Sequence, residues 1–517
     1  MAPDRRVILG IDVGSTAVRA TAFAVDGTGR HQAVREYPLL EPAPGWQVQE
    51  PDVLVAATLA ATAACVADTA GAEVVALALS AARHGLIGLD ATLTPVTPLL
   101  TGRDSRSSEA ARELRASGQS RELHRLTGTP VRPMSPLCKL LWFARHEPRL
   151  CAATRWWVDL KDYLLHRLTG TMVTELSAAS GTGLFDVRRR EWSRTILDLA
   201  GVSESQLPSV LPTTAVLRLS AAVGRAVGLP SGTPVVVGAG SGPSGSLGAG
   251  AIDRTVGLLT LGATGAVRTV VAAPLVDPDE SFCCGALTED AWVVGGAVRN
   301  GGDVVRWAAR TLAPDLAPSP GDDGETPALL DLAERVAPGS DGLVMLPYLL
   351  PDQGTDEVAG PPGALLGLRA AHSRGHLARA AVEGVCLQLG ELCDRLAALT
   401  PVDDVRLAGA TFRSPLWRAV MAAVLGRPAR VVGATDDATL GAAALGLFAI
   451  GEAADLREAV TRLAPQCADT DPVPVDPALA ATYRGLRTKL PALVSLACRT
   501  GEILAETTVG LSARARP

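Results

Sequence analysis

The sequence lacks several features that mark particular classes of protein. Only Lys139, Lys161 and Lys489 are lysines, no segment is rich in lysine and arginine, and the formal net charge is −6. This composition argues against binding to nucleic acid or to an anionic membrane. No apolar run reaches the ~20 residues needed to span a bilayer, and the N-terminus has no apolar segment followed by a cleavage site. We therefore expect a cytoplasmic protein.

The nine cysteines do not have the spacing of a metal site. Cys283 and Cys284 are adjacent, and Cys386 and Cys393 lie in a segment with a helical pattern. Structural zinc sites instead use pairs of ligands at short, regular spacings. We expect these side chains to be buried, reduced thiols that pack in the core.

Length and composition predict a folded protein with two large domains. Hydrophobic residues make up 47% of the chain and charged residues 20%, which is typical of globular proteins. A chain of 517 residues is too long for one ordinary core. We place the first domain at residues 1–250 and the second at 251–465, followed by a helical tail at 466–517.

The first motif is a small-residue turn, Asp12-Val13-Gly14-Ser15-Thr16, between predicted strands at 7–11 and 18–24. Such a turn lets backbone amides and hydroxyls approach phosphate oxygens, and the aspartate can hold Mg²⁺ through water. The Gly-Lys-Ser/Thr of a Walker loop is absent, as are the spaced glycines of a dinucleotide fold. The pattern recurs at Gly262-Ala263-Thr264-Gly265, between predicted strands at 256–261 and 266–271. The repeat suggests two similar halves that face each other across a cleft.

Apolar periodicity places the other elements. It predicts helices at 53–69, 107–126, 373–399, 416–425 and 477–498, and strands at 74–80, 234–239, 405–407 and 429–432.

Several ordered stretches, together with the two turns, carry a family resemblance. They are SAARHGL (80–86), TGRDSRS (101–107), MSPLCKLLW (134–142), KDYL (161–164), SAASGTGLF (177–185), GGAVRNGG (295–302) and HSRGHLARA (372–380) with Glu383-Gly384. From about residue 6 to about residue 465 the chain resembles the FGGY carbohydrate kinases, most closely their gluconokinase-like and xylulokinase-like members. The resemblance implies an α/β protein with two actin/hexokinase-like (ribonuclease H-like) domains facing each other across a cleft. It also implies phosphorylation of a sugar or sugar acid by ATP with Mg²⁺. Dimers are common among proteins of this kind, so a homodimer is possible, although the sequence does not settle the oligomeric state.

Carried over by position, the resemblance assigns roles to particular residues. The phosphate-binding residues would be Gly14, Ser15, Thr16, Gly262, Ala263 and Thr264, with Asp12 holding Mg²⁺ through water. The substrate-binding residues would be Arg83, His84, Asp104 and Arg106, and the adenosine-binding residues Gly409, Ala410 and Asp437. Taken without the family, His84 is also consistent with a hydrogen-bonded histidine at a strand end. Lys139 and Lys161 fit either a salt bridge on a helix surface or at an interface, or a ligand contact.

The sequence departs from the family pattern at the catalytic base. In these kinases the strand before the second domain ends in Gly-Asp-Gly, and this aspartate accepts the proton of the attacking hydroxyl. Here Ser241 stands at the aligned position, and no Asp or Glu lies between Pro234 and Ile252. A serine is no general base near neutral pH without an activating partner, and general-base catalysis typically contributes roughly 10²–10⁴-fold.

Three hypotheses about function follow from Ser241. The first is a working sugar or sugar-acid kinase in which another carboxylate, or a water, takes the role of the base. The second is a catalytically inactive pseudokinase that binds nucleotide or sugar as a sensor or partner protein. The third is a kinase for an acidic acceptor that needs no base, with Arg83 and Arg103 supplying an anion site, although both also fit solvated arginines in an arginine-rich chain. The first is favoured because Asp12, both phosphate turns and the sugar-side residues are all present.

Overall fold

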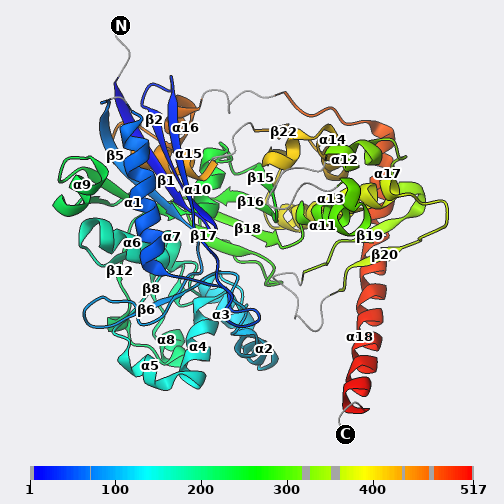
Figure 1. Cartoon of the computed structure of the whole chain (residues 1–517), viewed down its shortest axis with the longest axis horizontal. Helices are drawn as coiled ribbons and strands as arrows, with labels where there is room; N and C mark the ends of the chain where they lie inside the picture. Colours follow the sequence, from blue (N-terminus) through cyan, green and yellow to red (C-terminus); the bar gives the residue numbers. More distant parts are fainter. Residues whose placement is uncertain are drawn as a thin grey trace. The chain divides into compact units, whose positions relative to one another are not determined.

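The computed structural model describes residues 5–69, 71–316, 327–350, 361–432, 437–464 and 471–514, and only the backbone of 437 and 505–514. The chain is an α/β protein that forms two compact units (Figure 1). The first unit contains residues 1–254, 269–295 and 436–469, and the second contains 255–268, 296–435 and 470–517. The predicted domain bounds at 250 and 465 stay a prediction.

The first six-stranded sheet has the order β13-β14-β5-β1-β2-β3. Its strands are β1 (Arg6–Val13), β2 (Ala17–Ala24), β3 (Arg30–Glu36), β5 (Glu73–Ala81), β13 (Val216–Arg218) and β14 (Pro234–Gly240). The central strands β14, β5 and β1 are parallel neighbours, whereas β1 and β2 form an antiparallel hairpin. The carboxyl ends of β1, β5 and β14 therefore lie at the same edge of the sheet.

The central strand β1 is buried because helices cover both faces of the sheet. Alternate side chains of a strand point to opposite faces. Leu9 and Ile11 belong to a core shared with α1 (Pro51–Ala67) and α6 (Leu160–Thr169). Ile8 belongs to a second core with α15 (Asp437–Ala449). At Gly10 a Cβ would overlap the carbonyl oxygen of Thr439, so the absence of a side chain lets α15 lie directly on β1.

The second six-stranded sheet repeats the local order of the first. It runs β17-β18-β16-β15-β21-β22, so that β18-β16-β15-β21-β22 corresponds to β3-β2-β1-β5-β14. Its strands are β15 (Val256–Leu261), β16 (Gly265–Val271), β17 (Cys283–Ala286), β18 (Trp292–Val298), β21 (Asp404–Ala408) and β22 (Ala429–Val431). As in the first sheet, the leading strand β15 pairs in parallel with β21. The repeat predicted from the two small-residue turns is confirmed.

The remaining strands pair in short two-stranded sheets. Their members are β4 (Val48–Gln49) with β7 (Leu99–Leu100), β6 (Ile87–Leu89) with β8 (Trp156–Val158), β9 (Val173–Glu175) with β12 (Ser209–Leu211), β10 (Phe185–Asp186) with β11 (Glu191–Trp192), and β19 (Val344–Leu346) with β20 (Ala364–Leu366).

The first unit contains further helices. They are α2 (Ser108–Ala116), α3 (Ser120–Thr127), α4 (Pro136–His146), α5 (Pro148–Ala153), α7 (Leu176–Ala179), α8 (Arg194–Ala200), α9 (Ala221–Val227), α10 (Ser241–Gly248) and α16 (Leu456–Leu463). The single helix predicted at 107–126 is wrong. The chain breaks between α2 and α3 at Gly118, whose φ of 78° is left-handed and ends the helix.

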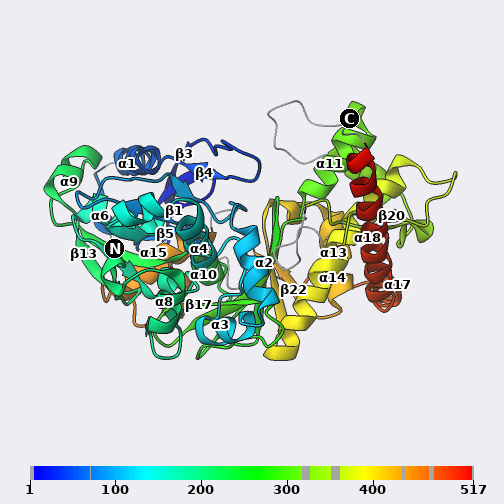
Figure 2. The ribbon, with the colours of Figure 1, turned by 90° about the horizontal axis from the view of Figure 1, so that it is seen from below.

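In the second unit, α13 packs against α11, α12 and α14, and α14 packs against α17 (Figure 2). The helices of this unit are α11 (Asp303–Leu312), α12 (Pro327–Glu334), α13 (Arg374–Leu399), α14 (Pro415–Leu425), α17 (Pro477–Arg487) and α18 (Leu490–Arg514). The single helix predicted at 477–498 is therefore two helices. Among the described residues, none of the helices combines the length and the apolarity that crossing a membrane requires.

Candidate active site

The centre of the candidate site is a carboxylate that accepts two serine hydroxyls. Asp12 lies at the end of β1, Ser80 near the end of β5, and Ser241 directly after β14. The hydroxyl of Ser241 donates to Oδ1 of Asp12 at 2.6 Å, and that of Ser80 donates to the same oxygen at 2.7 Å. The structure thus places an acid in direct contact with the residue that replaces the expected catalytic aspartate. The sequence analysis assigned no role to Ser80. Its position, as a small polar residue near the end of the strand that pairs in parallel with β1, is the signal that could have identified it as a partner of Asp12.

The backbone before Ser241 is held by close packing that only small residues allow. Gly238 has a φ of 73°, and a Cβ there would overlap the carbonyl oxygen of Leu79. The pairing of β14 with β5 shifts register at this point. The amide of Gly240 donates to the hydroxyl of Ser177 at 3.0 Å. These contacts fix the direction in which the chain leaves β14, and so the position of Ser241 at the start of α10.

The turn after Asp12 is anchored through its carbonyl groups. The hydroxyl of Tyr37 donates to the carbonyl of Gly14 at 2.7 Å, and the side-chain amide of Gln49 donates to that of Ser15 at 2.8 Å. The side chains of Ser15 and Thr16 are exposed. The turn is therefore anchored by its carbonyls and exposes its hydroxyls, an arrangement suited to an anion, and its phosphate-binding role stays a prediction. Tyr37 and Gln49 come from later segments, and no local motif marks them as partners of this turn.

His84 is held in an unusual backbone conformation and a defined protonation state. Its φ is 69°, a left-handed value that is uncommon outside glycine and concentrates at functional sites. Its Nδ1 lies 2.8 Å from the carbonyl oxygen of Gly181 and must therefore donate to it. Burial, followed by the charge of Arg83, lowers the pKa of His84 to about 3. The ring is thus neutral at physiological pH, with Nε2 left as a hydrogen-bond acceptor.

Lys139 connects the two predicted substrate-binding segments. Its ammonium group is buried and donates to the carbonyl oxygens of His84, Leu100 and Thr101 at 2.6, 3.1 and 2.8 Å. Burial lowers the pKa of Lys139 to about 7. The sequence left a salt bridge and a ligand contact open for Lys139. Its ammonium group makes neither, because it is buried and all three of its partners are backbone carbonyls. Lys139 instead fixes the backbone at His84 and at the loop that leads to Asp104.

Lys161, in contrast, forms a salt bridge, but the pair is buried in the first unit and does not lie on a helix surface. It is buried against Glu175, whose carboxylate also accepts the amide of Ala178 at 2.8 Å. Glu175 thereby caps α7, the helix that contains Ser177. Lys161 therefore supports the segment that holds the amide of Gly240, one residue before Ser241.

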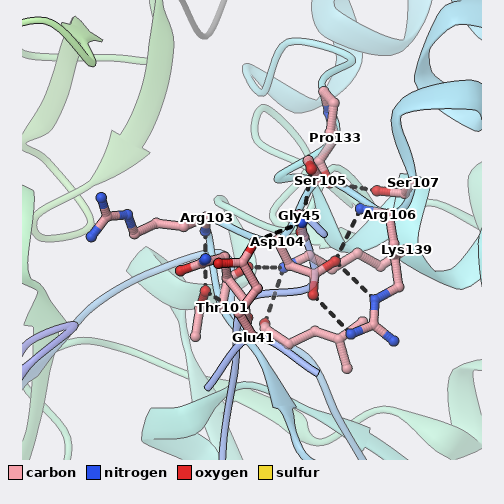
Figure 3. Close-up of polar contacts among 12 residues, drawn as sticks. Glu41, Gly45, Thr101, Arg103, Asp104, Ser105, Arg106, Ser107, Pro133 and Lys139 are labelled. Carbon is pink, nitrogen blue, oxygen red and sulfur yellow. Dashed lines mark hydrogen bonds and ion pairs between the residues drawn. The ribbon is translucent and has the colours of Figure 1, made fainter. Parts of the chain in front are cut away.

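Asp104 and Arg106 bind each other (Figure 3). Nε and Nη2 of Arg106 donate to the two carboxylate oxygens of Asp104 at 2.9 and 2.8 Å, and Asp104 is 1% exposed. The guanidinium lies 4.0 Å from the ring centroid of Trp46, a favourable cation–π distance. Arg103 is exposed and extends away from this pair in Figure 3. The pair stiffens the loop beside Lys139, and its contact with a sugar stays a prediction.

The second small-residue turn has a comparable support in the second unit. Residues Gly262, Ala263 and Thr264 are exposed. The amides of Gly301 and Gly302 donate to the carbonyls of Ala263 and Gly262 at 3.1 and 2.8 Å. As in the first turn, the carbonyl groups are anchored while the side chains face outward. A phosphate-binding role for this turn stays a prediction.

The predicted adenosine residues lie in two places. Gly409 has a φ of 116°, and a Cβ there would overlap the carbonyl oxygen of Leu261, so Gly409 and Ala410 lie beside the end of β15, where the second turn begins. Asp437 begins α15, which packs on β1 in the first unit, and its side chain lies outside the described residues. This placement does not test whether Gly409, Ala410 and Asp437 contact a nucleotide, so their adenosine-binding role stays a prediction.

Comparison with known proteins identifies the family. The N-terminal domain model of the FGGY family of carbohydrate kinases matches residues 7–248, and the C-terminal domain model matches residues 258–450. The gluconokinase of Bacillus subtilis (strain 168) is 31% identical over 453 residues, covering 86% of this chain and 88% of its own length. The xylulose kinase of Escherichia coli (strain K12) is 28% identical over 462 residues, covering 88% of this chain and 92% of its own.

The structural comparison agrees with the sequence comparison. The crystal structure of gluconate kinase from Lactobacillus acidophilus superposes with a TM-score of 0.89 at 27% identity, covering 96% of this chain and 99% of that one. The fold, the repeated sheet order and the two small-residue turns described above extend over the residues that both domain models match. The chain therefore belongs to the FGGY family of carbohydrate kinases.

Proposed function

We propose that this protein transfers the terminal phosphoryl group of ATP to a hydroxyl of a sugar or sugar acid, as a gluconokinase-like or xylulokinase-like enzyme. The observation that carries the proposal is the contact between Ser241 and Asp12 at 2.6 Å. It supplies the activating partner that an isolated serine lacks. Ser241 is also partly exposed, so its oxygen is accessible to an acceptor.

The proton of the acceptor would leave through this pair. The acceptor's O–H proton passes to the oxygen of Ser241 while the proton of Ser241 passes to Oδ1 of Asp12. His84, neutral and with Nε2 as an acceptor, would orient the acceptor by a hydrogen bond from one of its hydroxyls. Phosphoryl transfer depends mostly on positioning and electrostatics, so a relay that is weaker than a direct aspartate can still support turnover.

Each of the two turns, one in each unit, would bind phosphate oxygens. Ser15 and Thr16 in the first and Ala263 and Thr264 in the second are exposed and can donate to phosphate oxygens. No cluster of three or more His, Cys, Asp or Glu side chains suited to a metal occurs in the part of the chain that the structure describes. Mg²⁺ is commonly held by one or two carboxylates, substrate phosphates and waters, and Asp12 fits that role through water. When bound, Mg²⁺ neutralises charge on the phosphate oxygens.

The test is the rate of ADP formation by the wild type and by Ser241→Asp, with gluconate, xylulose, ribulose and glycerol as acceptors. We expect acceptor-dependent turnover by the wild type and a rise of about 10-fold or more in kcat for Ser241→Asp, because a direct general base contributes roughly 10²–10⁴-fold. Binding of Mg-ATP, measured by thermal shift, is expected for both proteins. No stabilisation by millimolar Mg-ATP would contradict the proposal.

A second candidate is favoured by Ser241 itself, since it replaces the residue expected to be the base. A pseudokinase would bind Mg-ATP yet show no turnover with any of the four acceptors, in the wild type and in Ser241→Asp alike. Turnover of an acidic acceptor by the wild type without any gain in Ser241→Asp would instead support the base-free kinase. A cytoplasmic location and a homodimeric assembly remain predictions from the sequence.

A further inference from the structure

Among the residues that the structure describes, Arg83 is a half-buried cation without a partner, whereas the fully buried arginines and lysines all have one. Arg132 donates to two backbone carbonyls, Lys139 to three, Lys161 pairs with Glu175, and Arg379 pairs with Glu383. Arg83 has no hydrogen bond or ion pair with any residue that the structure describes, and its Nη1 is fully buried. An uncompensated cation at such a place is costly to fold, so it is expected where a ligand supplies the opposite charge.

Two glycines make the space in which this side chain lies. A Cβ at Gly240 would be in hard contact with Cγ and Cδ of Arg83, and a Cβ at Gly285 would overlap its Nη1. Gly240 directly precedes Ser241, and Gly285 lies in β17. The side chain of Arg83 thus runs from the end of β5 past the residue that precedes Ser241. A larger residue in place of Gly240 or Gly285 would displace Arg83.

Arg83 lies beside His84, which is predicted to bind the acceptor, and forms no salt bridge with the residues that the structure describes. The positive charge of Arg83 is one of the causes that lower the pKa of its neighbour His84, which places the guanidinium near that ring. Two groups lie close to the space that Arg83 occupies beside Gly240 and Gly285. One is the hydroxyl of Ser180, 3.6 Å from the Cβ position at Gly285, and the other is Gly181, whose carbonyl oxygen accepts the hydrogen bond of His84. Ser180 is already engaged, since it donates to the carbonyl of Ser177 and accepts the amide of Ala286. Neither group offers Arg83 a negative charge.

We infer that Arg83 is a specificity-determining residue that binds the carboxylate of the acceptor, so that the preferred substrate is a sugar acid and not a neutral sugar. The inference rests on the proposed kinase function and names the substrate class of the same site. A guanidinium binds a carboxylate through two parallel, charge-assisted hydrogen bonds, which give both affinity and orientation. A neutral ketose has no group that compensates the charge of Arg83.

The terminal phosphate of the nucleotide is the other anion that this site could meet, and the test separates the two. Binding of D-gluconate, D-xylulose and Mg-ATP is measured by isothermal titration calorimetry for the wild type, Arg83→Met and Arg83→Lys. Arg35→Met, which removes the same charge from the exposed strand β3, serves as the matched control. Circular dichroism and thermal melting establish that each variant is folded.

We expect the wild type to bind gluconate more tightly than xylulose. Arg83→Met should weaken gluconate binding by about 10- to 100-fold, the usual value of a charge-assisted pair, and leave xylulose and Mg-ATP unchanged. Arg83→Lys, which keeps the charge and loses the two-pronged geometry, should give an intermediate loss even if Arg83→Met fails to fold. Arg35→Met should bind all three ligands as the wild type does.

An equal loss for both sugars would mean that Arg83 only supports the fold, and a loss confined to Mg-ATP would place it on the phosphate side; either result overturns the inference. Wild-type protein that binds gluconate no better than xylulose also overturns it. The failure of the inference is distinguishable from that of the proposed function. Phosphorylation of xylulose but not of gluconate refutes the first alone, whereas the absence of transfer to any acceptor refutes the second.

Discussion

The two serines that donate to Asp12 form a matched pair for a test of the proton relay. Ser80 and Ser241 donate to the same oxygen at 2.7 and 2.6 Å, so replacing either with alanine removes one hydrogen bond to the carboxylate. A hydrogen bond to a charged group contributes about 1.5–3 kcal/mol, so both variants should lose a similar amount of unfolding free energy. Ser80, however, is fully buried within β5, whereas Ser241 is partly exposed. Of the two hydroxyls, only that of Ser241 is therefore accessible to an acceptor.

The two variants should therefore differ in catalysis much more than in stability. We expect Ser241→Ala to lower kcat by at least about 10-fold more than Ser80→Ala, because it removes the relay as well as the hydrogen bond. Urea unfolding gives the stability of each variant, and coupled ADP release at saturating Mg-ATP gives kcat. Equal losses of kcat in the two variants would show that both serines only hold Asp12, and would refute the relay.

Two further predictions concern the parts that hold the site. The folded-state pKa of His84 is lowered from 6.5 to about 3, so the unfolded chain binds the extra proton below pH 6.5. The wild type should then lose stability relative to His84→Asn by about 1.4 kcal/mol per pH unit as the pH falls from 6.5 toward 3, and parallel urea titrations that show the same pH dependence for both proteins would contradict the neutral ring. At Gly238, alanine should cost about 3 kcal/mol or more because its Cβ overlaps the carbonyl of Leu79, whereas Gly232, with a φ of 81° and open space around it, should cost only the ~1–2 kcal/mol of a left-handed residue. Similar losses in chemical denaturation of the two alanine variants would show that the close packing before Ser241 is unimportant.

Local sequence patterns were sufficient to predict the strands and turns of the site. The hairpin around Asp12 is encoded within about 20 residues by two apolar runs and a Gly-Ser-Thr turn, and β1 and β2 form as predicted. The same is true of β15 and β16 around Gly262. Helix ends were less predictable. The prediction of one helix at 107–126 passed over Ser117-Gly118, a turn signal, and the left-handed backbone at Gly118 shows that the helix ends there.

The contacts that determine the chemistry join residues far apart in the sequence. Asp12 meets Ser80 and Ser241 only because β14, β5 and β1 pair in parallel, and no local pattern fixes that order. From the sequence Ser241 was a missing base, whereas in the structure it is hydrogen-bonded to an acid. Lys139 could not be assigned either, because its partners are backbone carbonyls, and those carry no signal in the sequence.

The central claim is that this chain still transfers a phosphoryl group although Ser241 replaces the expected aspartate. The most direct measurement is ³¹P nuclear magnetic resonance of the wild-type protein incubated with Mg-ATP and gluconate, with xylulose in a parallel sample. The account predicts a phosphomonoester signal that grows in step with ADP. The signal should be absent without an acceptor and should grow more slowly in Ser241→Ala. Mg-ATP that stabilises the protein while no phosphomonoester forms with either acceptor would contradict it.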